Sequence, residues 1–336
     1  MSLSTATPPS QARIPAIDAA RGCALLGMFA FHLTWDLAFF GFVSPSAPFS
    51  PAMMAFGHCV AISFLALAGA SLVLASRGGM NWAAYRRRLA VVAAAAGVIT
   101  LATLLIFPDE FIFFGILHCI AAASVLALAF LRGPPWLALA AAAAMAITPL
   151  FVAVPALDNI FGWSLGLSAH QPRTNDWRPL LPWAGATIAG TGLMRMVLAR
   201  GVPKSVASWD AGNVATRALT WGGRHSLLVY LVHQPVFLGV VYLAALAAPP
   251  SESPAVAEES GFQTSCVAAC APSGASSGVC EALCECVSEA TRTAGLWRPM
   301  MDSKLTPAQS LRVDEITRQC APSREGAGAR RPLENQ

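Results

Sequence analysis

The sequence is poor in charged residues, and this scarcity excludes the soluble classes of protein. Only 12% of the 336 residues are charged, whereas 55% are hydrophobic and the mean hydropathy is +0.56. Such a composition is too apolar for an ordinary water-soluble domain. Disorder is excluded over most of the chain as well, because charge-free stretches such as 89–107 and 133–157 could not stay solvated.

Lysine is nearly absent, and the basic residues are dispersed along the chain. Lys204 and Lys304 are the only lysines among 22 basic residues, and the net charge is only +4. The arginines are scattered between apolar runs rather than gathered in one arm. This distribution argues against nucleic acid as a partner.

Long windows with little or no charge indicate seven membrane-spanning helices. A span needs about 20 apolar residues, and it must be helical because lipid offers the backbone no hydrogen-bond partners. The windows are 22–43, 51–75, 89–107, 111–131, 133–154, 180–198 and 226–248. The first exceeds the core of a cleavable signal peptide, and no basic residue precedes residue 13, so we expect it to be retained. The predicted fold class is an all-α polytopic membrane protein, with the lipid bilayer as a partner.

The basic residues near the span ends predict an orientation, because lysine and arginine resist translocation. Arginines precede the first window and follow the second, fourth and sixth, whereas the turns after the first and third carry none. The loop 155–179 carries balanced charges and is expected outside. We therefore expect the N-terminus in the cytoplasm and, after seven spans, the C-terminus on the opposite side.

The cysteines divide into two groups. Cys23, Cys59 and Cys119 lie in predicted spans, where small buried hydrophobes are expected. The tail after residue 248 holds the other six, namely Cys266, Cys270, Cys280, Cys284, Cys286 and Cys320. The first four form two pairs, each one helical turn apart, so two antiparallel helices could be stapled twice, with a third bridge left for the last two. Zinc is the weaker alternative because no tail histidine accompanies the cysteines, and no metal site is predicted.

These features predict five segments. Residues 1–12 and 322–336 are expected to be disordered, and 13–248 to form the membrane domain. A proline-containing linker would occupy 249–261, followed by a small disulfide-stapled helical domain over 262–321. Within that domain, Thr306, Pro307 and Gln309 form a capping-box sequence, which predicts a last helix reaching toward Cys320.

The first window carries the most polar side chains of any span. Charged groups inside a membrane usually face a cavity or a partner. Eleven residues separate Arg21 from His32, which is three helical turns plus about 20°, so both lie on one face about 16 Å apart. Asp36 follows His32 by one turn and could orient its imidazole as a general base. Asp18 precedes Arg21 by one turn and could touch it, and Arg21 would hold an anion. The alternative is an interfacial arginine with a structural histidine.

The spacing Arg21-x10-His32 resembles the signature on the first helix of transmembrane acyltransferases. The wider pattern is similar to bacterial members of the heparan-alpha-glucosaminide N-acetyltransferase catalytic-domain family over roughly residues 12–245. It consists of IDAARG (17–22), FHLTWDL (31–37), GILH (115–118), LLPW (180–183) and GRHSLLVYLVHQ (223–234). The cysteine-rich tail is no part of this pattern.

The resemblance implies an activity and a location. A membrane-bound O- or N-acyltransferase would move an acyl group, usually acetyl, from cytosolic acetyl-CoA to an extracytoplasmic sugar or related glycan-type acceptor. Acetyl-CoA would be a co-substrate, with no permanently bound cofactor. The membrane would be the bacterial inner membrane, and the cysteine-rich domain would be periplasmic. Direct attack on the thioester and an acyl-histidine intermediate on His32 are both compatible with the sequence.

Two further sets of residues are expected to bind the substrates. The phosphates of acyl-CoA need several arginines, and the candidates are Arg21, Arg86, Arg87, Arg88, Arg217 and Arg224, although these could also serve topology or touch anionic lipid. The acceptor path is expected along His58, His118, Asp176, Arg178, His233 and Gln234. The alternatives are interhelical hydrogen bonds for the histidines and a salt-bridged loop cap for the charged pair.

Two other functions are weighed against transfer. A haem-binding electron carrier could use His58, His118 or His233 as axial ligands, but no pair shares a span at ligating spacing. A transporter could use the polar stripe of the first span as a proton relay, but the spans show no duplicated half.

Overall fold

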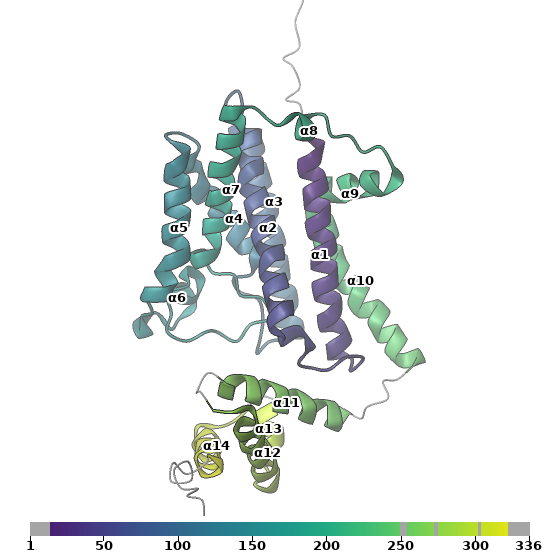
Figure 1. Cartoon of the computed structure of the whole chain (residues 1–336), viewed down its shortest axis with the longest axis vertical. Helices are drawn as coiled ribbons and strands as arrows, with labels where there is room; N and C mark the ends of the chain where they lie inside the picture. The colour runs from purple at the N-terminus through teal and green to yellow at the C-terminus, as the bar shows by residue number, and fades with distance from the viewer. Residues whose placement is uncertain (1–13, 249–253, 272–274, 302–303, 322–336) are drawn as a thin grey trace, which may run out of the picture. The chain divides into compact units, whose positions relative to one another are not determined.

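The computed structural model describes residues 14–248, 254–271, 275–301 and 304–321 (Figure 1). The elements within these ranges are helices, apart from one isolated bridge between Val154 and Ser168. This confirms the predicted all-α fold class. The predicted disordered segments 1–12 and 322–336 lie outside the described residues. The predicted linker is partly helical, because residues 254–261 belong to helix α11 (Pro254–Cys270).

The described chain divides into two compact units. The first comprises residues 14–31 and 55–236, and the second comprises residues 32–54 and the described residues from 237 onward. The boundaries fall within the helices α1 (Pro15–Phe39), α2 (Pro51–Ala75) and α10 (Ser226–Ala247), so each of these helices contributes to both units.

Each of the seven predicted spans coincides with a helix. Besides α1, α2 and α10, these are α3 (Trp82–Ile106), α4 (Ile116–Ala127), α5 (Pro135–Phe151) and α7 (Leu180–Arg200). Among the described residues, α1, α2, α3 and α10 are long and apolar enough to cross a bilayer. The helix α4, prolonged by the 3-10 helix η2 (Leu128–Phe130), and α5 are shorter apolar helices. The count of seven spans stays a prediction.

The fourth span begins later than the sequence predicts. Residues 111–115 are not helical, and α4 starts at Ile116. The carbonyl oxygen of Phe111 accepts a hydrogen bond from the Thr174 hydroxyl at 2.8 Å, and that of Phe114 accepts one from the Arg178 amide at 3.1 Å. These bonds hold the non-helical segment against the loop before α7, which accounts for the later start.

Close packing of small residues joins α7 to α2. A Cβ atom on Gly69 of α2 would overlap the carbonyl oxygen of Thr187, and one on Gly190 of α7 would overlap that of Ala66. Both glycines therefore allow the two backbones to touch. Because lipid is as apolar as the helices, such close contacts supply much of the association between helices in a membrane.

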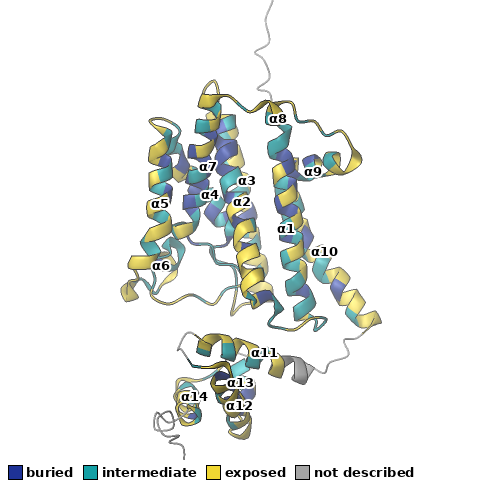
Figure 2. Cartoon of the chain, in the orientation of Figure 1, coloured by how far each residue is buried: buried dark blue, intermediate teal, exposed yellow. Residues whose placement is uncertain are grey.

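The helices differ in how much of their apolar surface the protein covers. In the most apolar window of α2, 44% of the residues are buried, against 11% in α3 and in α10. Figure 2 shows the corresponding exposed residues along much of α10. Exposed leucine, valine and isoleucine on these helices would meet water in a soluble protein, and they suit a lipid surrounding.

Arg195 of α7 fastens the turn between η2 and α5. Its Nη1 atom donates hydrogen bonds to the carbonyl oxygens of Phe130, at 2.7 Å, and Arg132, at 3.3 Å. Its Nη2 atom donates to the carbonyl oxygen of Gly133, whose φ of 77° lies in the left-handed region that glycine adopts most easily. One guanidinium thus satisfies three backbone acceptors, the first at the end of η2 and the other two in the turn that follows.

In the second unit the tail forms α11, α12 (Ser277–Thr293), α13 (Trp297–Met301) and α14 (Pro307–Cys320). The bridges Cys266–Cys284 and Cys270–Cys280 staple α11 to α12, and Cys286–Cys320 joins α12 to α14. This confirms the predicted disulfide framework. The predicted capping box is confirmed as well, because the Thr306 hydroxyl and the Gln309 side chain each accept the other residue's backbone amide.

Candidate functional site

A cavity of about 1420 Å³ lies in the first unit, among residues of α1, α2, α3, α4 and the segment from α9 (Val214–Arg224) into α10. This exceeds the roughly 300–1,000 Å³ of most small-molecule pockets, so the cavity can take a large ligand. One part of its lining is apolar and includes Phe64, Val92, Ile120 and Leu227. The rest is polar and strongly basic.

Five arginines line this cavity, namely Arg21, Arg77, Arg87, Arg88 and Arg224. Guanidinium groups bind phosphate through paired hydrogen bonds, so this lining suits a ligand with several phosphates. Four of the five belong to the set that the sequence predicts for acyl-CoA. The fifth, Arg77, is one of the arginines after the second predicted span, which were expected only to set the orientation in the membrane.

Two arginines of the predicted donor set have other surroundings. Arg86 and Arg217 are exposed, and neither is among the described residues that line the cavity. The Arg217 Nε atom donates to the carbonyl oxygen of Asn213 at 3.4 Å. The part of these two residues in donor binding stays a prediction.

A buried carboxylate connects two of the cavity arginines. Asp18 is only 7% exposed. Its Oδ1 atom lies 2.8 Å from Nη1 of Arg21, and its Oδ2 atom lies 3.3 Å from Nε of Arg224. The Nη2 atom of Arg21 donates to the hydroxyl of Ser71 on α2. Polar contacts therefore tie α1 to both α2 and α9 at the wall of the cavity.

Two glycines bring α9 against α1. A Cβ atom on Gly22 would overlap the carbonyl oxygen of Leu219, and one on Gly223 would overlap the carbonyl oxygen of Asp18. Helix α9 begins at an Asn213 cap, whose side chain accepts the Thr216 amide at 2.9 Å. This local arrangement delivers Arg224, at the end of α9, to the Asp18 carboxylate.

The predicted catalytic pair lies on the later part of α1, which belongs to the second unit. Because α1 is one continuous helix, Arg21, His32 and Asp36 keep the helical spacing that the sequence predicts. Asp36 is buried, at 3% exposure, and His32 is half-buried. Their catalytic role stays a prediction.

Three residues of the predicted acceptor path gather around Trp183 near the start of α7. The Arg178 guanidinium carbon lies 4.7 Å from the centre of the indole ring, and the His58 ring meets it edge-on with ring centres 5.3 Å apart. Asp176 lies 3.7 Å from the Arg178 guanidinium. Trp183 belongs to the LLPW motif, but no role in the site was predicted for it.

Asp176 also has a structural task. Its Oδ2 atom accepts the Ile116 amide at 2.8 Å, at the N-terminus of α4. A carboxylate at this position satisfies a free amide and complements the helix dipole. The contacts of Asp176 therefore resemble the predicted alternative, a salt-bridged loop cap. Arg178 faces the Trp183 ring.

The other predicted acceptor residues have different neighbours. The two ring nitrogens of His118 lie 3.3 Å from the Gly115 amide and 3.2 Å from the Thr100 hydroxyl of α3, which is the interhelical hydrogen bond of the alternative interpretation. His233 is buried and stacks on Phe29, with ring centres 5.7 Å apart. Gln234, next to it, is half-buried. Their place on an acceptor path stays a prediction.

The loop before α7 is held by Asp158, which no motif singles out. Its Oδ1 atom accepts the amides of Ala169 and His170 at 2.8 and 3.0 Å, and its Oδ2 atom lies 2.7 Å from Nδ1 of His170. The hydrogen bond with the His170 ring, helped by these amides, holds the pKa of the Asp158 carboxyl below its ordinary value. The loop that carries Asp176 and Arg178 is thereby closed on itself.

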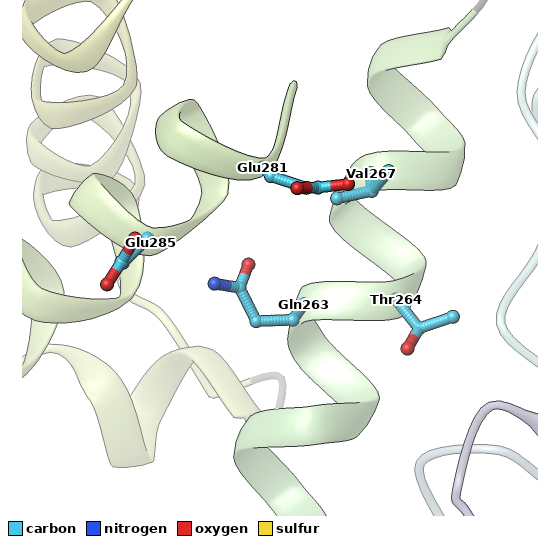
Figure 3. A pocket seen from close by; sticks show the side chains of 5 residues that line it. All are labelled: Gln263, Thr264, Val267, Glu281 and Glu285. Carbon is cyan, nitrogen blue, oxygen red and sulfur yellow. The ribbon is translucent and has the colours of Figure 1, made fainter. Parts of the chain in front are cut away.

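A second cavity, of about 560 Å³, lies within the second unit between α11 and α12. Figure 3 shows the side chains that line it, Gln263, Thr264 and Val267 on one helix and Glu281 and Glu285 on the other. The Glu281 carboxylate accepts a hydrogen bond from the Ser277 hydroxyl at 2.7 Å. Among the described residues, the lining of this smaller cavity carries two carboxylates and no arginine, unlike that of the larger cavity.

Apolar helices of membrane-spanning length indicate a membrane protein, and arginines line a large cavity within it. The sequence comparison specifies the class further. The family model described as "Heparan-alpha-glucosaminide N-acetyltransferase, catalytic" matches residues 13–235. The chain belongs to this family, and membership indicates a membrane acetyltransferase.

The match ends before the cysteine-rich tail and covers every residue that lines the larger cavity. A search of curated proteins and a search of solved structures each found no match.

Proposed function

We propose that this protein transfers an acyl group, in the first instance acetyl, from cytosolic acyl-CoA to an extracytoplasmic sugar or related acceptor. The observation that carries the proposal is the cavity of about 1420 Å³ with five arginines in its lining, within the segment that matches the acetyltransferase family. Neither a haem-binding protein nor a proton-coupled transporter needs a polyphosphate-sized basic cavity.

In this proposal the arginines bind the phosphates of the donor. Arg87 and Arg88 of α3 and Arg21 of α1 would form bidentate hydrogen bonds with them, which a lysine could not match in geometry. The apolar lining near Phe64 and Ile120 would receive the less polar arm of the donor.

His32 would act as the general base on the acceptor. Its imidazole takes the proton from the acceptor hydroxyl or amine, whose oxygen or nitrogen attacks the thioester carbonyl. The carbon–sulfur bond breaks, and the coenzyme A thiolate leaves and takes up a proton. Asp36, one helical turn after His32, would orient the imidazole and stabilise its protonated form. A route through acyl-His32 has the same overall balance.

The group around Trp183 would bind the acceptor. An aromatic face beside charged hydrogen-bonding groups suits a polyhydroxylated ring, because the ring has apolar C–H faces and polar edges. Arg178 and His58, which both contact the indole, would supply the polar contacts.

The orientation proposed for the membrane rests on the basic residues near the helix ends. Figure 1 shows the end of α2 and the starts of α3 and α5 at one end of the first unit, together with the end of α7. The turns and helix ends there carry Arg77, Arg86, Arg87, Arg88, Arg132 and Arg200. We place this end in the cytoplasm of a bacterium, with the N-terminus. Three disulfides support a periplasmic location for the tail.

The experiment uses membranes that contain the full chain, incubated with acetyl-CoA labelled on the acetyl carbon and with a glucosaminide as test acceptor. His32→Ala should abolish labelled product while the protein level stays unchanged. Leu26→Ala, a change at an exposed position of the same helix, should leave the rate unchanged and serves as the matched control. Full transfer by His32→Ala would exclude His32 as base, and absence of any labelled product with wild type would overturn the transferase proposal.

A further inference from the structure

One carboxylate sits inside a wall that otherwise attracts anions. Asp18 bonds to Arg21, three residues later on α1, and to Arg224, which is 206 residues away on α9. Both arginines line the large cavity, and so does Asp18 itself. A carboxylate at this position repels phosphate, so its presence calls for a role other than direct binding.

The contacts show what Asp18 does to the two guanidiniums. Arg21 is fixed on both terminal nitrogens, by Asp18 on one and by the Ser71 hydroxyl on the other, and its side chain is 20% exposed. Arg224 uses its Nε atom on Asp18, and its side chain is 45% exposed. The terminal amino groups of Arg224 are therefore held near the cavity by a bond made further back along the side chain.

The backbone around these contacts is built for them. Gly223, directly before Arg224, packs against the carbonyl oxygen of Asp18, where any Cβ atom would overlap. Figure 1 shows α9 beside the first half of α1. An arginine at the end of a short helix would otherwise sample many rotamers, and each rotamer lost on binding costs affinity. A charge pair formed before the ligand arrives removes part of that cost.

We propose that Asp18 is a positioning residue for the donor. It orients Arg21 and Arg224 so that the two guanidiniums present one preformed surface to the phosphates of acyl-CoA. This inference rests on the proposed function, because it concerns the same cavity. It predicts that Asp18 governs donor affinity and not the rate of the chemical step.

The test compares Asp18→Asn, Asp18→Glu and Asp210→Asn in purified full-length protein. Asp210 is an exposed loop aspartate and is the matched control. Asp18→Asn should raise the KM for acetyl-CoA about tenfold, equivalent to about 1.4 kcal/mol, with kcat changed less than about twofold. Asp18→Glu keeps the charge and should give an intermediate KM, and Asp210→Asn should match wild type. Melting temperatures of all variants show whether they are folded.

Arg224→Gln supplies a second, independent measurement. If Asp18 acts through Arg224, the KM of the double variant Asp18→Asn/Arg224→Gln should rise by less than the product of the two single effects. If Asp18→Asn is not recovered folded, Asp18→Glu and Arg224→Gln form the cycle. The inference would be overturned if folded Asp18 variants showed an unchanged or lower KM for acetyl-CoA, or a loss confined to kcat. None of these results would contradict the proposed transferase function. A wild type that neither binds coenzyme A nor transfers acetyl would overturn the proposed function itself.

Discussion

The guanidinium carbon of Arg178 lies over the indole of Trp183, 4.7 Å from the ring centre. Asp176, two residues before Arg178, caps α4, whereas Trp183 stands in the first turns of α7. The contact therefore fixes the end of a long loop on the start of a helix. It leaves an aromatic face and a cation in one place, next to the exposed His58.

This relationship predicts the effect of removing the ring. Trp183→Ala should lower kcat/KM for the acceptor about tenfold, since a loss of about 1.4 kcal/mol is typical of one good aromatic contact. The KM for acetyl-CoA should stay unchanged, because Trp183 is not among the described residues lining the donor cavity. Trp136→Ala, at an exposed position of α5, is the control. Equal losses for donor and acceptor would place the ring outside the acceptor site.

Three consecutive arginines at the start of α3 should behave differently. Arg87→Gln and Arg88→Gln should each raise the KM for acetyl-CoA about tenfold, because each removes a charge-assisted contact to phosphate. Arg86→Gln should leave it unchanged, since Arg86 is not among the described residues that line the cavity. Steady-state kinetics on the purified variants measure this. An effect of Arg86→Gln equal to that of its neighbours would mean that general positive potential, and not the cavity wall, binds the donor.

The contact between α2 and α7 predicts a stability effect. Gly69→Ala forces a Cβ atom onto the Thr187 carbonyl and should cost about 1–3 kcal/mol, seen as a lower melting temperature in detergent. Gly97→Ala on α3 meets nothing within 4 Å and should be neutral or stabilising by up to about 1 kcal/mol, since alanine is the better helix former. Equal melting temperatures for the two variants would contradict the close approach of α2 and α7.

The hydrogen bonds that Asp158 accepts from Ala169 and His170 predict that the stability of this loop depends on pH. The bond with His170 lowers the pKa of the Asp158 carboxyl in the folded loop. Its stabilisation is therefore fully present above the ordinary carboxyl pKa of about 3.9 and is lost as the pH falls through the lower folded value. Amide hydrogen exchange at Ala169 and His170, corrected for intrinsic rates, should accelerate below about pH 4. In Asp158→Asn that acceleration should disappear, and its persistence would assign the pH response to another group.

Much of the fold follows from the sequence, because charge-free windows and the bilayer leave few alternatives to helices. The tail disulfides follow as well, since cysteine pairs one turn apart can meet across two antiparallel helices. The start of α4 does not follow. Phe111 belongs to an apolar window, but its segment is held outside the helix by bonds with a loop about 60 residues away and with two threonines of α3. No local pattern reports such a distant partner.

The sequence predicts which residue types form the site better than it predicts which individual residues do. Composition points to arginines for a phosphate ligand, but successive helical residues point about 100° apart, and the sequence does not give the rotation of α3 about its axis. Arg86 is therefore indistinguishable from Arg87 before the fold is known. Arg77 and Trp183 are missed for a related reason. The cavity lining that Arg77 joins comes mainly from other helices, and Trp183 meets the His58 ring of α2.

The hydrogen bonds of Arg195 affect the choice of variants for testing the orientation of this protein in the membrane. One guanidinium holds the carbonyl oxygens of Phe130, Arg132 and Gly133, so a neutral replacement removes a fastening of the hairpin as well as a positive charge. If a topology reporter fused to such a variant gave the opposite orientation, the cause could be either the lost charge or the loosened hairpin. Arg200, which makes the same electrostatic contribution from an exposed helix end, is the cleaner position for dissecting membrane insertion.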